Sequence, residues 1–266
     1  MKEYLGQIIK EQPNILLKRS AVIEYLQARL LQSLQDSKAF LSLAFVGGTA
    51  LRFLYSLPRY SEDLDFSLVL PEKIDFNKFL YRIRKDFEAE NYKIFIKTKQ
   101  EKPVISAFIR FQGLLYELNL SPLRDEVLSV KIEIDINPPE GGTTTTTLFR
   151  RYVMLNVLHY DKSSLFAGKL HAILARKYTK GRDIFDLVWM FADSSWTVPN
   201  FVLLNNALQQ TKWKGQKINN KNWKSILLKH IKNINWKVVV NDAAPFLERE
   251  GDRKILTRKN FLSLTS

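Results

Sequence analysis

The chain has 266 residues, of which 45% are apolar and 26% charged, the balance of an ordinary soluble globular protein. It contains no cysteine, which excludes disulfides, zinc–thiolate sites and thiol catalysis, and it has only three histidines, so any metal would be held by carboxylates. The net charge of +14 is uneven: residues 1–150 hold 21 Lys and Arg against 19 Asp and Glu, and residues 151–266 hold 20 against 8.

The charge difference bears on the class of partner. The first part sums to +2 (21 − 19) and the second to +12 (20 − 8). A basic half beside a neutral half favours a polyanionic partner, nucleic acid first, and the alternative is a solvated surface. The sequence has no apolar run of about 18 residues and no apolar signal core at its start, so we expect a cytoplasmic protein that does not contact a membrane.

The first 150 residues alternate between helix and strand signals. Residues 1–35 predict helix with a break at Pro13, residues 39–46 a buried strand, and residues 49–57 a short helix. Residues 62–69 alternate between apolar and polar side chains, as in a half-buried strand. Further on, residues 75–90 predict an amphipathic helix, and four more stretches predict strands: 92–98, 104–111, 114–120 and 129–136.

The chain changes character after the segment NPPEGGTTTTT at residues 137–147, which predicts a break in regular structure. Its threonine run fits either a surface loop or an extended edge segment. Beyond it, apolar spacing predicts helices at residues 163–179, 183–193, 199–210 and 221–234. We therefore expect an α/β protein with two domains: a mixed-sheet domain with an N-terminal helical segment (1–150), and a mostly helical, basic domain (151–266).

Two carboxylates stand out on the strand predicted at 62–69. Asp63 and Asp65 lie at positions i and i+2, which places both on one face, about 7 Å apart. Neighbouring anions repel unless a cation lies between them, so this pair indicates a divalent-metal site. Taken alone, the pair favours an exposed polar face.

A glycine turn precedes this strand and favours the metal site over the exposed polar face. Gly47, Gly48 and Thr49 connect the buried strand to the next helix, and such a turn lets backbone N–H groups approach a phosphate. A phosphate cradle followed by paired carboxylates supplies both halves of a metal–triphosphate site. Asp135, on the polar face of the strand at 129–136, is a candidate third carboxylate, and three carboxylates can hold two Mg²⁺ or Mn²⁺ ions.

The stretch GGTALRFLYSLPRYSEDLDFSL resembles the first motif of the nucleotidyltransferase superfamily, and its wording is similar to the AbiEii/AbiGii toxins of type IV toxin–antitoxin and phage-defence systems. The stretch AGKLHAILARKYTKGRDIFDL agrees with the later motifs of that group. The resemblance covers about residues 45–190. It implies an enzyme that transfers a nucleoside monophosphate from an NTP, with Mg²⁺ or Mn²⁺ as cofactor.

The same resemblance implies a role for each matching residue. Gly47, Gly48 and Thr49 would bind the triphosphate, and the metal ligands would be Asp63, Asp65 and Asp135, the last by strand context only. Lys169 would contact the nucleotide phosphates from a helix that also carries Arg176. The final motif would contribute to nucleotide binding or to the positioning of Lys169 through Arg182, Asp183 and Asp186.

Several other polar and aromatic residues have structural interpretations beside functional ones. Arg52 is expected to pair with an acidic residue and fix the turn, and Arg59 or Ser61 could contact a phosphate. His171 is expected to be structural or on the surface rather than catalytic. Residues 205–240 contain eight lysines, three tryptophans and no acidic residue. Lysines beside aromatic residues suit RNA. Trp223, however, lies on an apolar stripe that indicates the core.

The resemblance implies a toxin that transfers NMP to an acceptor hydroxyl. The basic second half favours RNA as the acceptor, and the resemblance implies a 3′ end such as that of tRNA. The alternatives are a protein or small-molecule acceptor, or a non-catalytic RNA-binding protein on the same fold. In a type IV system the cognate antitoxin need not contact the toxin.

Overall fold

The structure is a computed structural model that describes residues 2–70 and 75–265. It separates into two compact units. The sheet unit comprises Met1–Ser56, Tyr60–Asn137 and Thr146–His159, and the helical unit comprises Leu57–Arg59, Pro138–Thr145 and Tyr160–Ser266. The expected α/β class is confirmed. The boundary expected between residues 150 and 151 falls inside a strand, so the last part of the sheet belongs with the strands before it.

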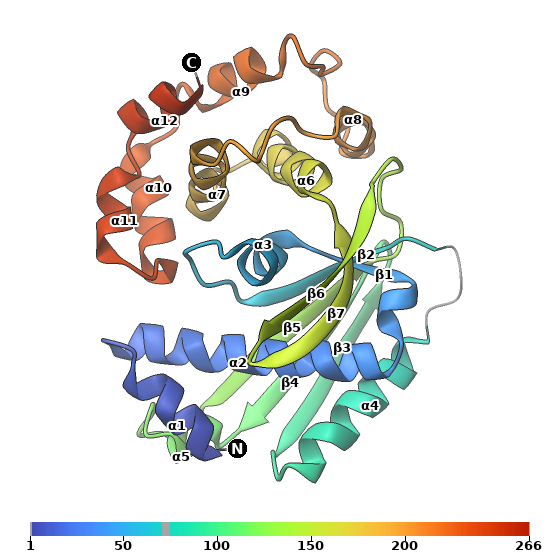
Figure 1. Ribbon diagram of the computed structural model, residues 1–266, viewed down its shortest axis with the longest axis vertical. Helices are drawn as coiled ribbons and strands as arrows, with labels where there is room; N and C mark the ends of the chain where they lie inside the picture. Colours follow the sequence, from blue (N-terminus) through green and yellow to red (C-terminus); the bar gives the residue numbers. More distant parts are fainter. Residues whose placement is uncertain (1, 71–74, 266) are drawn as a thin grey trace. The chain divides into compact units, whose positions relative to one another are not determined.

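The sheet has seven strands in the order β3-β4-β5-β2-β1-β7-β6 (Figure 1). β2 pairs in parallel with β5 and antiparallel with β1, whereas β1 and β7 run parallel. β3, β4 and β5 form antiparallel neighbours. The bounds of the strands are β1 Leu43–Val46, β2 Asp63–Leu68, β3 Ile94–Glu101, β4 Val104–Gln112, β5 Val127–Asp135, β6 Thr144–Arg151 and β7 Val153–Tyr160.

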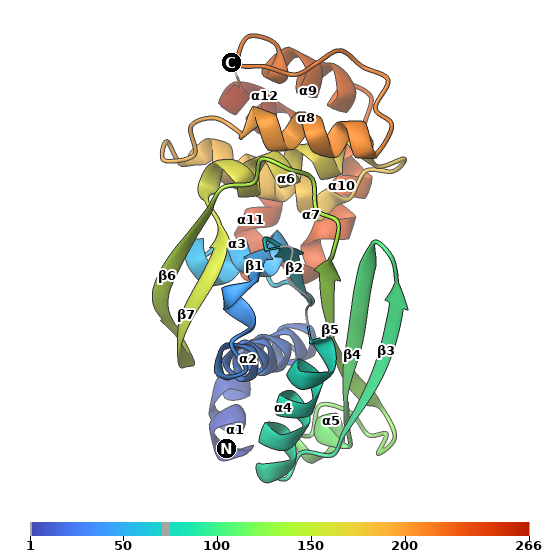
Figure 2. The ribbon, with the colours of Figure 1, turned by 90° about the vertical axis from the view of Figure 1, so that its right-hand side faces the viewer.

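One face of the sheet is apolar and covered by helices. Leu64 and Phe66 of β2 and Ile132 of β5 are buried there. Helix α2 (Ile15–Asp36) contacts β5 and α4 (Phe76–Ala89), and Figure 2 shows α2 and α4 beside the strands. The Phe87 ring of α4 lies 5.3 Å from the Phe111 ring of β4. The period-two pattern of the strands therefore leaves the opposite, polar face for other side chains.

Helix α3 (Gly47–Tyr55) is fixed to α2 by a buried ion pair. Arg52 of α3 pairs with Glu24 of α2, and both side chains are buried, which confirms that Arg52 pairs with an acidic residue. The Arg52 guanidinium also lies 4.0 Å from the centre of the Tyr60 ring. Burying a charge is tolerable only when it is paired, so this contact fixes the helix that begins at the glycine turn.

Three local expectations were wrong or incomplete. The strand predicted at 114–120 is a helical turn, α5 (Leu114–Glu117), after Gly113 with φ +74°. Its buried leucines, Leu114, Leu115 and Leu118, follow helical rather than strand spacing. The predicted strand at 39–46 begins with a 3₁₀ turn, Ala39–Leu41. Of the segment expected to be irregular, residues 144–147 form the start of β6, an edge strand, in agreement with the extended reading of the threonine run.

The helical unit is built around aromatic side chains. Trp223 is buried as expected, and its ring lies 5.5 Å from that of Phe166 and 6.0 Å from that of Phe191. No helix in the described part of the chain is long and apolar enough to cross a membrane. The helices are α6 Lys162–Ala175, α7 Gly181–Ala192, α8 Phe201–Gln210, α9 Trp223–Ile231, α10 Trp236–Ala243, α11 Glu250–Ile255 and α12 Arg258–Thr265, while α1 of the sheet unit spans Lys2–Lys10.

Candidate active site

A row of residues crosses five strands on the polar face of the sheet. Val46 of β1 is paired with Asp65 of β2, Asp65 with Glu133 of β5, and Glu133 with Ser106 of β4. Ser106 is in turn paired with Lys99 of β3. Directly paired residues share a face of a sheet, so the row leads from the start of the glycine turn, past a carboxylate, to the β3–β4 hairpin.

The glycine turn and Asp65 are in close contact. Gly47 has φ +80°, a conformation that other residues rarely adopt, and a Cβ at this position would overlap the Asp65 carboxylate. Helix α3 begins at Gly47, and the N–H groups of a first helical turn have no partners within the helix. The two features that the sequence separates by about fifteen residues are therefore adjacent.

Thr49 and Asp63 are linked through the backbone. The Thr49 side chain is fully buried, and its hydroxyl donates a hydrogen bond to the main-chain oxygen of Asp63. The hydroxyl thus connects α3 to β2, and a phosphate contact by Thr49 would have to come from its backbone N–H. Asp63 is paired with Lys131 of β5, on the same face as Asp65.

Asp135 lies two residues further along β5 than Glu133, the strand partner of Asp65. Its partner on β2 is Ser67, whereas the acidic residue directly beside Asp65 is Glu133. The Asp135 side chain accepts a hydrogen bond from the Asn137 N–H at 2.9 Å, and burial raises its pKa despite this bond. Glu133 forms an ion pair with Lys131 at 2.6 Å. The strand register, which the sequence alone does not give, therefore adds Glu133 as a candidate.

The donor atoms fit a hard divalent cation. Carboxylate oxygens are the ligands that Mg²⁺ and Mn²⁺ prefer, and Gly47 leaves room for the Asp65 carboxylate that a Cβ would fill. Within residues 2–70 and 75–265, however, no three His, Asp or Glu side chains form a group that could hold a metal by themselves. The site thus fits a metal that Asp63 and Asp65 share with oxygens of a bound nucleotide.

The residues of the later motif form a separate buried cluster in the helical unit. Lys169 of α6 donates to Asp183 of α7 at 3.0 Å and pairs with Asp186 at 2.7 Å. Asp186 is fully buried and also accepts two hydrogen bonds of 2.6 Å from the Arg59 guanidinium. Arg176 pairs with the other oxygen of Asp183. Three cations and two anions therefore compensate one another.

The cluster shifts the pKa of Lys169 and that of Asp183 toward the charged forms. Burial alone would lower the pKa of Lys169, but the charges of Asp186 and Asp183 more than offset it and raise that pKa. Burial would likewise raise the pKa of Asp183, and the charges of Lys169 and Arg176 lower it instead. Both residues are therefore held ionised at neutral pH.

Two details of this cluster were not evident from the sequence. The helix predicted at 163–179 ends at Ala175, and Arg176 reaches Asp183 from an extended C-cap position. Arg59, considered above as a phosphate contact, is buried and bound to Asp186 instead. The Arg182 guanidinium lies 3.9 Å from the centre of the Phe246 ring.

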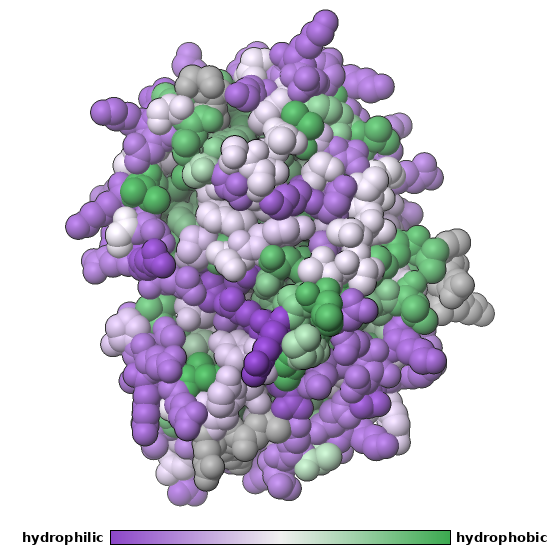
Figure 3. Space-filling model, in the orientation of Figure 1, coloured by the Kyte–Doolittle hydropathy of each residue, from purple (hydrophilic) through white to green (hydrophobic). Residues whose placement is uncertain are grey.

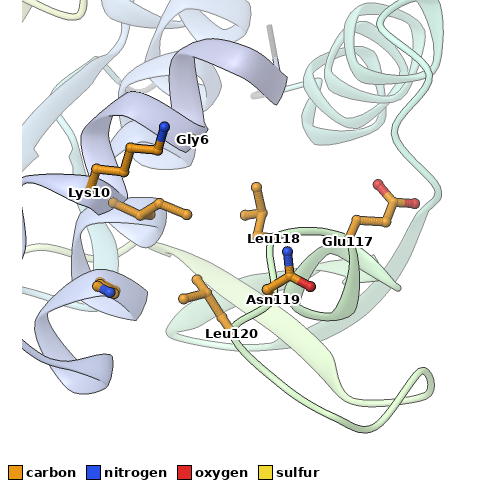
Figure 4. Close-up of a pocket in the computed structure, with 8 residues that line it drawn as sticks. Gly6, Lys10, Glu117, Leu118, Asn119 and Leu120 are labelled. Atoms are coloured by element: carbon orange, nitrogen blue, oxygen red, sulfur yellow. The ribbon is translucent and has the colours of Figure 1, made fainter.

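Other polar positions have structural roles. His171 shares a hydrogen bond of 3.1 Å with Thr211, and burial followed by the charge of Arg176 lowers its pKa, in line with its expected structural role. A cavity of about 360 Å³ lies at α1 and α5, where Lys10 and Leu118 face it (Figure 4). Its lining includes none of the aspartates named above, so we do not place the chemistry there.

One family model and two solved structures are similar to this chain. The model of the family described as nucleotidyl transferase AbiEii toxin, type IV toxin–antitoxin system, matches residues 29–258. The structure of JHP933 from Helicobacter pylori is similar, with 20% identity, 92% of this chain and 94% of that chain covered, and a TM-score of 0.48. A second H. pylori structure, described as a candidate nucleotidyltransferase, has 19% identity, coverage of 88% and 94%, and a TM-score of 0.45.

No curated protein sequence matches the chain. The family match nevertheless extends over most of the chain and includes the glycine turn, the paired carboxylates of β2 and the Lys169–Asp183–Asp186 cluster. On this evidence the chain belongs to the AbiEii family of nucleotidyltransferase toxins of type IV toxin–antitoxin systems.

Proposed function

We propose that this nucleotidyltransferase transfers a nucleoside monophosphate from an NTP to the 3′ hydroxyl of an RNA, with tRNA as the acceptor class. The observation that carries the proposal is the contact between the Gly47 turn and the Asp65 carboxylate. A phosphate cradle and a metal-binding carboxylate are useful together only when a polyphosphate lies between them.

In the proposed reaction the acceptor oxygen attacks the α-phosphorus of the NTP. The new bond joins this oxygen to phosphorus, the bond from the α-phosphorus to the bridging oxygen breaks, and pyrophosphate leaves. The backbone N–H groups at Gly48 and Thr49 hold the departing phosphates. A carboxylate of β5 accepts the proton of the hydroxyl, and the two candidates are Asp135 and Glu133.

Asp63 and Asp65 would hold the divalent metal, Mg²⁺ or Mn²⁺, together with phosphate oxygens. Such a metal neutralises charge that develops on the phosphate oxygens and polarises the acceptor hydroxyl. Lys169 as a contact of the nucleotide phosphates stays a prediction. Its bonds to Asp183 and Asp186 support a role in which the ammonium group is held ionised and in one position.

The charge of the helical unit supports RNA as the acceptor. All eight lysines of residues 205–240 are exposed, and this basic surface comprises Lys212, Lys214, Lys217, Lys221, Lys224, Lys229, Lys232 and Lys237. Figure 3 shows hydrophilic side chains over the C-terminal helices at the top of the view. Of the three tryptophans in this stretch, Trp213 and Trp236 are half-buried rather than buried in the core. Lysines near partly accessible aromatic rings suit a phosphate backbone with unpaired bases.

The test is incubation of the purified protein with each α-labelled NTP, Mg²⁺ or Mn²⁺, and either tRNA or a cell lysate. Label should appear on RNA, and Asp63→Asn and Asp65→Asn should abolish it while the melting temperature stays near that of the wild type. Glu133→Gln and Asp135→Asn, compared side by side, identify the third carboxylate by the larger loss of kcat. Near-wild-type turnover of the Asp65→Asn variant would refute the site.

A different acceptor remains the second candidate function. Label on a protein or a small molecule, with none on RNA, would favour it and leave the transferase chemistry unchanged. No transfer at all, with RNA binding intact, would favour a non-catalytic RNA-binding protein. In cells, growth inhibition that disappears with Asp63→Asn would link the chemistry to toxicity, and relief by the cognate antitoxin without a stable complex would fit a type IV system.

A further inference from the structure

The β3–β4 hairpin forms a pocket on the polar face of the sheet unit. The pocket has a volume of about 390 Å³, and six of its lining residues carry the argument: Lys99, Lys102, Ser106, Phe108, Lys131 and Glu133. In the strand register, Lys131 of β5 lies beside Asp63 of β2, and Glu133 lies beside Asp65. The pocket therefore adjoins the candidate metal ligands without containing either of them.

The strand order fixes on which side of those ligands the pocket lies. The glycine turn follows β1, whereas β5, β4 and β3 lie on the other side of β2. The row from Val46 through Asp65, Glu133 and Ser106 to Lys99 runs from the turn into the pocket. Neighbouring strands are about 4.8 Å apart, so Ser106 lies about 10 Å beyond Asp65, two strand spacings away.

The direction of attack at phosphorus indicates on which side of Asp65 the acceptor binds. In-line displacement places the attacking oxygen and the leaving group on opposite sides of the phosphorus. The leaving pyrophosphate is held by the glycine turn, on the β1 side. The acceptor must then approach across β5 and β4. We propose that the hairpin pocket binds the 3′-terminal nucleotides of a single-stranded RNA acceptor.

The side chains in the pocket suit such a strand. The Phe108 ring is half-buried and faces the polar side, and the Lys131 ammonium lies 5.5 Å from its centre, a cationic and aromatic surface on which a base can stack. Lys99 and Lys102 are exposed on the hairpin. Lys99 forms an ion pair with Glu101 at 2.9 Å, and Lys102 makes no ion pair with a described residue. Both ammonium groups are exposed and can therefore contact RNA phosphates.

This inference rests on the proposed transfer to RNA, and the experiment separates the two. The change is Lys99→Gln with Lys102→Gln. The matched control is Lys78→Gln with Lys85→Gln, two exposed lysines on α4, which covers the apolar face. Both pairs remove two charges from the same unit. The probes are tRNA and a single-stranded RNA oligonucleotide with a free 3′ hydroxyl, with transfer and binding measured separately.

The hairpin pair should raise the KM for RNA severalfold and leave the KM for NTP unchanged. It should also lower the slope of log affinity against log salt by about 1.4, at about 0.7 for each lost contact with a single strand. Phe108→Leu keeps apolar bulk but removes the stacking surface, and it should raise the KM for RNA about fivefold or more. The control pair should match the wild type in each measurement.

Three results would overturn the inference. Equal effects of the hairpin and control pairs would mean that the lysines act only through net charge. A rise in the KM for NTP instead of the KM for RNA would place the nucleotide in the pocket. If the wild type transfers label to RNA while all hairpin variants keep wild-type values, the pocket is not the acceptor site although the proposed function holds. If the wild type labels no RNA, the proposed function itself fails.

Discussion

Asp186 is the residue on which the buried cluster of the helical unit depends most. It is fully buried and accepts hydrogen bonds from Arg59 and Lys169. Asp186→Asn keeps the shape of the side chain but removes its charge. The cluster changes from three cations and two anions to three cations and one anion, and the Asn nitrogen is placed against a guanidinium that can only donate.

The size of the effect follows from the burial of the partners. Removing one member of a buried ion pair costs about 3–5 kcal/mol, because the remaining charge stays buried without compensation. For a chain of this size each kcal/mol lowers the melting temperature by about 2–4 °C, which gives a decrease of about 6–20 °C. Exposed side chains are not subject to this penalty, so Asp193→Asn at the end of α7 is a matched control.

The assay is thermal unfolding of both variants at pH 7, followed by circular dichroism, with urea unfolding as a second measurement. We expect a large loss of stability for Asp186→Asn and a melting temperature near the wild-type value for Asp193→Asn. If the two variants melted together, the cluster would not be a stabilising element of the helical unit. Double substitution of Arg59 and Asp186 by Met and Leu should recover part of the loss, since it removes the uncompensated charge.

The remaining predictions concern the turn, the pH dependence and the basic surface. Gly47→Ala should abolish transfer and lower the free energy of unfolding by about 1–2 kcal/mol, because Gly47 has a positive φ. Gly168→Ala is the control: this residue lies inside α6 with open space around it, so the substitution should raise the free energy of unfolding by about 0.5–1 kcal/mol in urea. The pKa of Asp183 is lowered in the folded state, so its contribution to stability is fully present above pH 3.8 and is lost as the pH falls through the folded-state pKa. The pKa of Lys169 is raised, so its contribution is fully present below pH 10.5 and is lost as the pH rises through the folded-state pKa. Melting temperatures across pH should show a weaker acid dependence for Asp183→Asn than for the wild type. Replacing Lys221, Lys224, Lys229 and Lys232 by Gln should lower the salt slope of RNA binding by about 2.8–3.6 without changing the KM for NTP, and an unchanged slope would mean that the basic surface is only solvated.

Local pattern was sufficient for most of the sheet unit. The alternation of residues 62–69 and 129–136 gave the faces of β2 and β5, because period two follows directly from strand geometry. The glycine turn gave the start of α3. The assignment of 114–120 as a strand failed because four leucines and a tyrosine fit both periods over so short a stretch, and only Gly113 with its positive φ decides between them.

What the sequence could not supply is the pairing between distant segments. The register of β5 against β2 places Glu133 rather than Asp135 beside Asp65, and a shift of two residues would leave the alternating pattern unchanged. The bond from Arg59 to Asp186 joins residues 127 positions apart. Neither follows from periodicity or composition. Lys169 and Asp183, which are 14 positions apart, were brought into one motif by family resemblance rather than by local physics.

The path of the chain between the two units has a consequence for fragment expression. The chain enters the helical unit at Leu57–Arg59, again at Pro138–Thr145, and finally at Tyr160. No single truncation point therefore yields either unit whole. A fragment that begins at residue 151 would lack Arg59, and Asp186 would lose two of its hydrogen bonds. Dissection of this protein therefore calls for internal linkers rather than terminal deletions.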